Sequence, residues 1–190
     1  VGTAGGVLPD YSRYLYAAGP ARPVGVTNYK GVMGDVFFSG PWFNTTAEYA
    51  GYWATDPWCC GNGAVVPSDW SRKKALLSIT DGTSNTFLAG EDVYYQPTVG
   101  PTDFEAIGRG YSWAQPYEAG RTCAIPPNNR PMPPVNPNDV NELSGFKSQH
   151  SGGLNFALCD GSVRFFANGI DLATYRGLAT IRKGESVSAP

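Results

Sequence analysis

The chain has 190 residues, which is enough for one domain with its own hydrophobic core. Sixteen acidic residues outnumber fourteen basic ones, and the scattered lysines and arginines argue against a nucleic-acid-binding surface. No apolar run is long enough to span a membrane as a helix. The 24 glycines, 16 prolines and 13% aromatic residues predict one β-rich α+β domain over residues 1–190, with long Pro/Gly/aromatic loops.

The first third of the chain predicts short strands separated by loops. A glycine-rich stretch at residues 1–8 is expected to be extended, and the valines of VGVTNYKGVMGDVFF predict strand pieces interrupted by glycines. Residues 37–58 hold many large rings without a clean helical or strand period, which indicates a long structured loop. Its candidate interface aromatics are Trp42, Phe43, Tyr52, Trp53 and Trp58. Asn44, followed by two threonines, has the form of a glycosylation acceptor.

The segment DWSRKKALLSITDGTSNTFLAGEDVYY has the clearest pattern in the middle of the chain. A short helix is expected to carry Ala75, Leu76 and Ile79, and Asp81-Gly82 predicts a turn. The side chains that follow, Asn85 among them, are of the kind that bond to nearby backbone. TFLAG then predicts a buried strand. The later stretch RTCAIPPNNRPMPPVNPND must be a loop, because its prolines remove backbone donors.

The C-terminal part predicts a β-hairpin over about 154–167 and then a helix. Apolar residues alternate with other side chains on both sides of Asp160-Gly161, a dipeptide that favours tight hairpin turns. Asn168-Gly169 ends the second strand, and a short amphipathic helix is expected over 172–178. Residues 186–190 are expected to form a frayed tail.

The four cysteines are Cys59, Cys60, Cys123 and Cys159. With no CxxC pair and one histidine, they are poorly suited to a zinc site. Two disulfides are the preferred interpretation, with Cys59 and Cys60 each joined to Cys123 or Cys159 because adjacent cysteines rarely bridge each other. Two connectivities remain open, and buried free thiols are the alternative.

The stretch QHSGGLNFALCDGSVRFFANGID contains the chain's one histidine, His150. A nucleophile triad would need this histidine beside an activated Ser or Cys, yet the sequence has no nucleophile elbow, P-loop or GxGxxG, so we expect no enzyme activity. In the structural interpretation, the imidazole bonds across to the Asp160-Gly161 turn or to a carbonyl. Gly152, Gly153 and Gly161 then allow the turns that this arrangement needs.

Calcium is an intermediate hypothesis for the same stretch. Asp160, Asp171 and nearby carbonyls could supply oxygen ligands, although no EF-hand loop is present. No other cofactor is expected.

The spacing of His150 and Asp160-Gly161 resembles the H-X9-DG motif of prepilin-type proteins in the DUF1559 group, which are pseudopilin-like. GGLNFALCDGSVRFFANGIDLATYRGLATIRKGE resembles the C-terminal end of that family, and ITDGTSNTFLAGE resembles its middle motif. RTCAIPPNNRP is similar to its Pro/Asn loop, and TNYKGVMG to the strand after its N-terminal helix. The likeness is patchy over residues 27–185.

The resemblance implies a type IV pilin-like head, with an antiparallel sheet and long decorated loops, exported and processed by a prepilin peptidase. Family members begin with a peptidase site and a long apolar helix, and this sequence shows neither. We therefore expect either a trimmed chain or a relative that assembles without the helix.

The function expected from these observations is that of a secreted or cell-surface structural protein that self-associates into a filament, tube or surface layer. The rings of residues 37–58 exceed what one hairpin can bury, so some are expected to meet another copy, the alternative being that they fill the domain's own core. One alternative is a carbohydrate-binding module, with Trp42, Trp53 or Trp58 stacking on the sugar rings of a polysaccharide. Another is a minor pseudopilin of a type II secretion-like machine.

Overall fold

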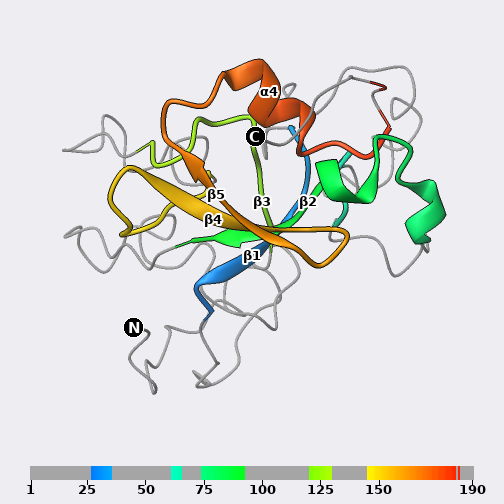
Figure 1. Ribbon diagram of the computed structural model, residues 1–190, viewed down its shortest axis with the longest axis horizontal. Helices are drawn as coiled ribbons and strands as arrows, with labels where there is room; N and C mark the ends of the chain where they lie inside the picture. The colour runs from blue at the N-terminus through cyan, green and yellow to red at the C-terminus, as the bar shows by residue number, and fades with distance from the viewer. Residues whose placement is uncertain are drawn as a thin grey trace, which may run out of the picture.

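The computed structural model describes residues 27–35, 61–65, 74–92, 120–129, 145–182 and 184 (Figure 1). Its elements are β1 (Tyr29–Val32), the 3-10 turns η2 (Leu76–Ser78) and η3 (Thr83–Asn85), β2 (Phe87–Glu91), β3 (Gly120–Arg121), β4 (Gly153–Leu158), β5 (Val163–Ala167) and helix α4 (Leu172–Gly177). Predictions for residues 1–8 and 186–190, the aromatics of 37–58, Asn44, Cys59 and Cys60 lie outside these ranges.

The five strands form one sheet in the order β3-β1-β2-β4-β5. The pairs β1–β2, β2–β4 and β4–β5 are antiparallel, whereas β1 and β3 are parallel, with Gly31 opposite Gly120. The expectation of an antiparallel sheet is therefore wrong at this edge, and the sheet is mixed. β3 is not the neighbour of β1 in the chain, so no hairpin turn between these two strands sets its direction.

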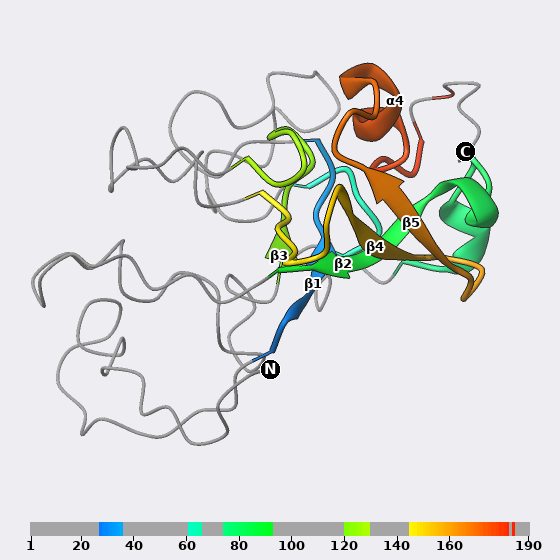
Figure 2. The same ribbon diagram turned by 60° about the vertical axis from the view of Figure 1, so that its left-hand side comes forward.

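The predicted C-terminal hairpin is confirmed as β4 and β5, joined through Asp160-Gly161 (Figure 2). Asp160 accepts hydrogen bonds through Oδ1 from the backbone N–H and the hydroxyl of Ser162, at 2.8 and 2.7 Å. Gly161 has φ of 87°, a conformation that a side chain would strain. The aspartate and the glycine of this dipeptide therefore both stabilise the turn.

The predicted C-terminal helix is confirmed within a residue. Asp171 caps α4 by accepting the Thr174 N–H at 2.8 Å, which satisfies one of the free donors of the first turn. The helix expected around Ala75, Leu76 and Ile79 is shorter than predicted, being the single 3-10 turn η2. Leu76 and Leu77 of that turn are 68% and 96% exposed, so no core packing supports a longer helix there.

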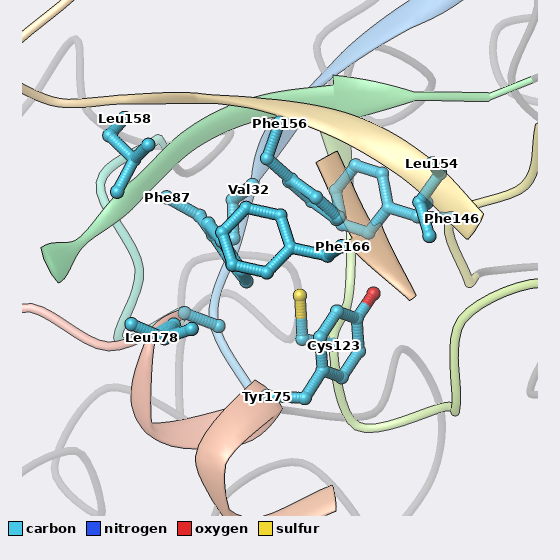
Figure 3. Packing of buried hydrophobic residues seen from close by; sticks show 11 residues of the cluster. Val32, Phe87, Cys123, Phe146, Leu154, Phe156, Leu158, Phe166, Tyr175 and Leu178 are labelled. Carbon is cyan, nitrogen blue, oxygen red and sulfur yellow. The ribbon is translucent and has the colours of Figure 1, made fainter. Parts of the chain in front are cut away.

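The core lies between one face of the sheet and α4, as Figure 3 shows. The ring of Phe87 stacks on Phe156 with centroids 4.1 Å apart, and Phe166 meets Phe87 edge-on at 4.8 Å. Tyr175 and Leu178, both fully buried, cover these rings from the helical side. The core cluster consists of Val32, Phe87, Cys123, Phe146, Leu154, Phe156, Leu158, Phe166, Tyr175, Leu178 and Ala179.

Strand periodicity explains this core. Leu154, Phe156 and Leu158 alternate on β4 and all face α4, as expected for a sheet with one covered face. Among the described residues, no helix is long and apolar enough to cross a membrane.

Candidate functional site

His150 lies just before β4 and contacts the end of β2. Its Nε2 is 3.2 Å from Oε1 of Glu91, an ion pair whenever the imidazole is protonated. The histidine side chain is 58% exposed, whereas that of Glu91 is only 11% exposed. The contact therefore joins a surface imidazole to a largely buried carboxylate.

The predicted contact between His150 and the Asp160-Gly161 turn is wrong. The two residues lie at opposite ends of β4, whose six residues in extended conformation span about 20 Å. Each end instead contacts β2 or the turn that precedes it. The backbone N–H of Asp160 donates to the carbonyl of Thr83 at 3.1 Å, while His150 reaches Glu91.

Glu91 is the central polar residue at the His150 end. Its Oε2 accepts the backbone N–H of Asn155 at 2.8 Å, and its Oε1 lies 3.2 Å from the Asn155 side-chain amide. Burial would raise the pKa of Glu91. The hydrogen bonds from Asn155 and Ser148 and the charge of His150 outweigh burial and lower that pKa. The carboxylate is thus held ionised as an acceptor shared by several donors.

The backbone explains why a side chain fills this role. The carbonyl of Glu91 accepts the N–H of Lys147 at 3.0 Å, and the next residue, Asp92, forms a parallel bridge with Lys147. Two segments of the chain therefore contact the end of β2, one at Lys147 and the other at Asn155. The Glu91 carboxylate supplies the acceptor that the Asn155 N–H would otherwise lack.

A buried ion pair lies beside Glu91 in sequence. Asp92 Oδ2 is 2.8 Å from Arg121 Nε, and the two side chains are 4% and 5% exposed. Arg121 belongs to β3 and also donates from Nη1 to the carbonyl of Gly120 at 3.0 Å. Removing either charge would leave the other buried without its partner, which is strongly destabilising. The pair ties the short edge strand β3 to the end of β2.

Asn128 connects the proline-rich loop to the same region. Its side chain donates to the carbonyl of Gly153 at 3.3 Å and to Oδ1 of Asn168 at 2.6 Å. Its Oδ1 accepts the N–H of Ser148 at 2.7 Å. Asn128 has φ of 54°, a left-handed conformation that asparagine tolerates better than most residues.

The opposite end of β4 is held by the residues that follow Asp81. The N–H of Cys159 donates to the carbonyl of Thr86 at 2.9 Å, next to the bond between Asp160 and Thr83. Gly82, with φ of 95°, presents its carbonyl to the N–H of Asn85 at 3.0 Å. Asp81 Oδ1 accepts the Gly184 N–H at 3.0 Å. The sequence predicted Asp81, Gly82 and Asn85 as motif residues, and the structure places all three in this turn.

The two glycines where β4 begins serve different purposes. Gly152 has φ of 83° and open space around it, so it is needed for the turn. Gly153 is needed for close approach, because a Cβ there would meet the carbonyl oxygen of Phe166 and the ring of Phe165.

The two described cysteines carry free thiols, contrary to the disulfides expected for them. Cys123 is fully buried among core rings beside Tyr175, and burial raises its pKa far above the ordinary value. Cys159 is half-buried at the hairpin turn, where burial and the charge of Asp160 raise its pKa to about 11. Cys123 is held by core packing and Cys159 by a backbone hydrogen bond at the turn, so neither position needs a disulfide.

The carboxylates proposed for calcium have other partners. Asp160 binds Ser162, and Asp171 caps α4 through Thr174. These bonds lower the pKa of each carboxyl group. Within the described ranges, no group of three or more His, Cys, Asp or Glu side chains is placed to hold a metal ion.

Sequence reasoning identified His150 but missed Glu91 and Asn155. The available signal was the acid that ends ITDGTSNTFLAGE, directly after a buried strand. Asn128 could have been suspected as the middle of an asparagine-containing proline loop. These contacts bring together the four segments TNYKGVMG, ITDGTSNTFLAGE, RTCAIPPNNRP and the C-terminal hairpin with α4.

Three of these segments and the C-terminal hairpin lie within a match to a known family, which ends inside α4. Residues 19–173 match the family model described as "Protein of unknown function (DUF1559)". The match covers most of the chain, so the chain belongs to this family. No curated protein and no solved structure matches it.

Proposed function

We propose that the chain is a non-catalytic, exported structural subunit that self-associates into a filament, tube or surface layer. The observation that carries this proposal is a set of exposed apolar side chains on the sheet face opposite the core. Val163 and Phe165 of β5 are 67% and 50% exposed, and Tyr29 of β1 is 63% exposed. A subunit that packs against its own copies buries such side chains at the contact.

Strand register shows which residues lie between these exposed side chains. Phe165 pairs with Asn155 on β4, and Val163 pairs with Ala157, which in turn lies opposite Ala89 on β2. Residues paired across neighbouring strands project to the same side of a sheet. Small side chains therefore border Val163, whereas Asn155 and Glu91 lie between Phe165 and Tyr29.

The polar motif residues support a structural role over a catalytic one. The Glu91 carboxylate accepts bonds that hold β4, and Asp160 fixes the hairpin turn. His150 contacts a carboxylate whose acceptor atoms already serve Asn155. Glu91 and His150 thus hold separate chain segments together, and Asp160 stabilises a single turn.

The test is negative-stain electron microscopy of the full chain, combined with sedimentation velocity over a range of concentrations. The proposal expects ordered polymers, or oligomers whose mass rises with concentration. Monodisperse single particles at high concentration would overturn it and favour a minor subunit that needs other proteins to assemble.

A further inference from the structure

The two edges of the described sheet differ in what they offer a neighbour. Strand β3 has two residues, Gly120 and Arg121, and both are buried. Strand β5 has five residues and an exposed outer face. It contains no proline, no irregularity in its pairing with β4 and one charged residue, Arg164. Native proteins usually protect an edge strand with such features, and β5 has few of them.

The hairpin register shows which backbone groups of β5 point outward. The backbone N–H of Leu158 donates to the carbonyl of Ser162, and the N–H of Asn168 donates to the carbonyl of Gly152. Ser162, Asn168 and every second residue between them therefore direct their backbone N–H and C=O groups toward β4. Hydrogen bonding alternates along an antiparallel pair. The N–H and C=O groups of Val163, Phe165 and Ala167 therefore point away from β4. The Ala167 carbonyl already accepts the Ile170 N–H at 3.0 Å, which places the end of the edge at this residue.

We propose that β5 pairs antiparallel with β5 of a second copy, about a two-fold axis at Phe165. This inference rests on the proposed self-association and names the surface responsible for one contact. Among the described strands, the other edge is β3, which has only two residues, both buried, and so offers β5 of another copy little to pair with. Within the described sheet, the edge that suits β5 of one copy is therefore β5 of another copy.

The sequence of β5 suits this register. With Phe165 opposite Phe165 of the second copy, all five residues overlap, and Val163 lies opposite Ala167 of the other strand. Arg164 then faces Phe166 of the second copy. A shift that centred the pair on Arg164 would set two guanidinium groups directly opposite each other, which is unfavourable. The register with full overlap therefore also keeps the two Arg164 side chains from lying opposite each other.

The first test is oxidative cross-linking of a Phe165→Cys variant of the full chain. Residues opposite each other in a hydrogen-bonded pair have Cα atoms about 5.5 Å apart, within the range of a disulfide. The expected product is a disulfide-linked dimer joined at position 165, identified by peptide mass spectrometry. Leu77→Cys is the matched control, since Leu77 is 96% exposed and would cross-link at least as readily through random collision. Equal dimer yields from the two variants would overturn the proposal.

The second test does not depend on thiols. Phe165→Lys and Phe165→Glu each place like charges on the proposed axis and remove aromatic packing, so each should weaken dimerisation about tenfold. An equimolar mixture should recover association, because lysine then meets glutamate. A contact in which residue 165 meets a different residue would give no recovery in the mixture, and this result would refute the two-fold pairing. Circular dichroism melting checks that both variants fold.

The outcomes separate this inference from the proposed function. Polymers that form normally with Phe165→Lys would leave the structural role standing and reject the β5 contact. A specific dimer at position 165 with no polymer under any condition would support the contact and reject the polymer. A two-fold contact closes a dimer, so a polymer built on it uses a second surface as well.

Discussion

Replacing Glu91 by glutamine should destabilise the domain, because one residue serves donors from two segments. The amide oxygen of glutamine can still accept the Asn155 N–H, now at 2.8 Å from the carboxylate. Its amino group then faces the other donors, the Asn155 side chain and His150 Nε2. Losing a charge-assisted bond and creating a contact between donors should cost about 1–2 kcal/mol. Glu91→Ala removes every acceptor and should cost about 2–4 kcal/mol.

The pH dependence of this loss identifies its source. Because the folded-state pKa of Glu91 lies below the ordinary value of 4.5, the carboxylate contributes its full stability above pH 4.5. That contribution is lost as the pH falls through the folded-state pKa. The difference in unfolding free energy between native protein and Glu91→Gln should therefore be constant near neutral pH and shrink below pH 4.5. Urea denaturation followed by circular dichroism at several pH values measures it.

The matched control is His150→Ala, which removes the imidazole and leaves the bonds to Asn155. Its ring is more than half exposed, so the loss should stay below about 1 kcal/mol. A double-mutant cycle with Glu91→Gln gives the coupling between the two side chains. The reasoning fails if His150→Ala costs as much as Glu91→Ala, or if the Glu91→Gln difference does not change with pH.

Three further predictions follow from the packing. Gly90→Ala should cost about 1–3 kcal/mol because its Cβ would meet two core rings, whereas Gly169→Ala, with open space around it, should leave the thermal midpoint nearly unchanged. In native protein at pH 8, iodoacetamide should modify Cys159 slowly and Cys123 only after denaturation; rapid labelling of Cys123 would contradict its burial. Asn128→Ala should cost about 2–3 kcal/mol, measured by urea unfolding, since it removes three hydrogen bonds at a positive φ.

Local signals in the sequence predicted the elements that they specify directly. The hairpin followed from Asp160-Gly161 between alternating apolar residues, and α4 followed from an amphipathic pattern over 172–178; its capping aspartate, Asp171, is a finding of the structure. Both elements depend on neighbours within a few positions. Their bounds agree with the structure because turn and cap chemistry act over the same short range.

The site could not be predicted in the same way, since its partners lie far apart in the chain. Asn155 meets Glu91 across 64 positions, and Asn128 meets Ser148 across 20. Which residues face each other depends on the register of β2 against β4 and on the crossing at Lys147. The parallel strand β3 has two residues and therefore too little sequence to carry a periodic pattern. The cysteine prediction failed for Cys123 and Cys159 because counting thiols gives no information on burial.

The spacing of His150 and Asp160 follows from the length of β2. From Thr86, whose carbonyl binds Cys159, to Glu91, which binds His150, the chain advances about 17 Å along the strand. The antiparallel partner must cover the same distance between its two contacts, and β4 with its flanking turns does so. One residue more or fewer would turn the core side chains of β4 to the opposite face. The interval between the two motif residues is therefore a strand length, and neither residue needs to contact the other.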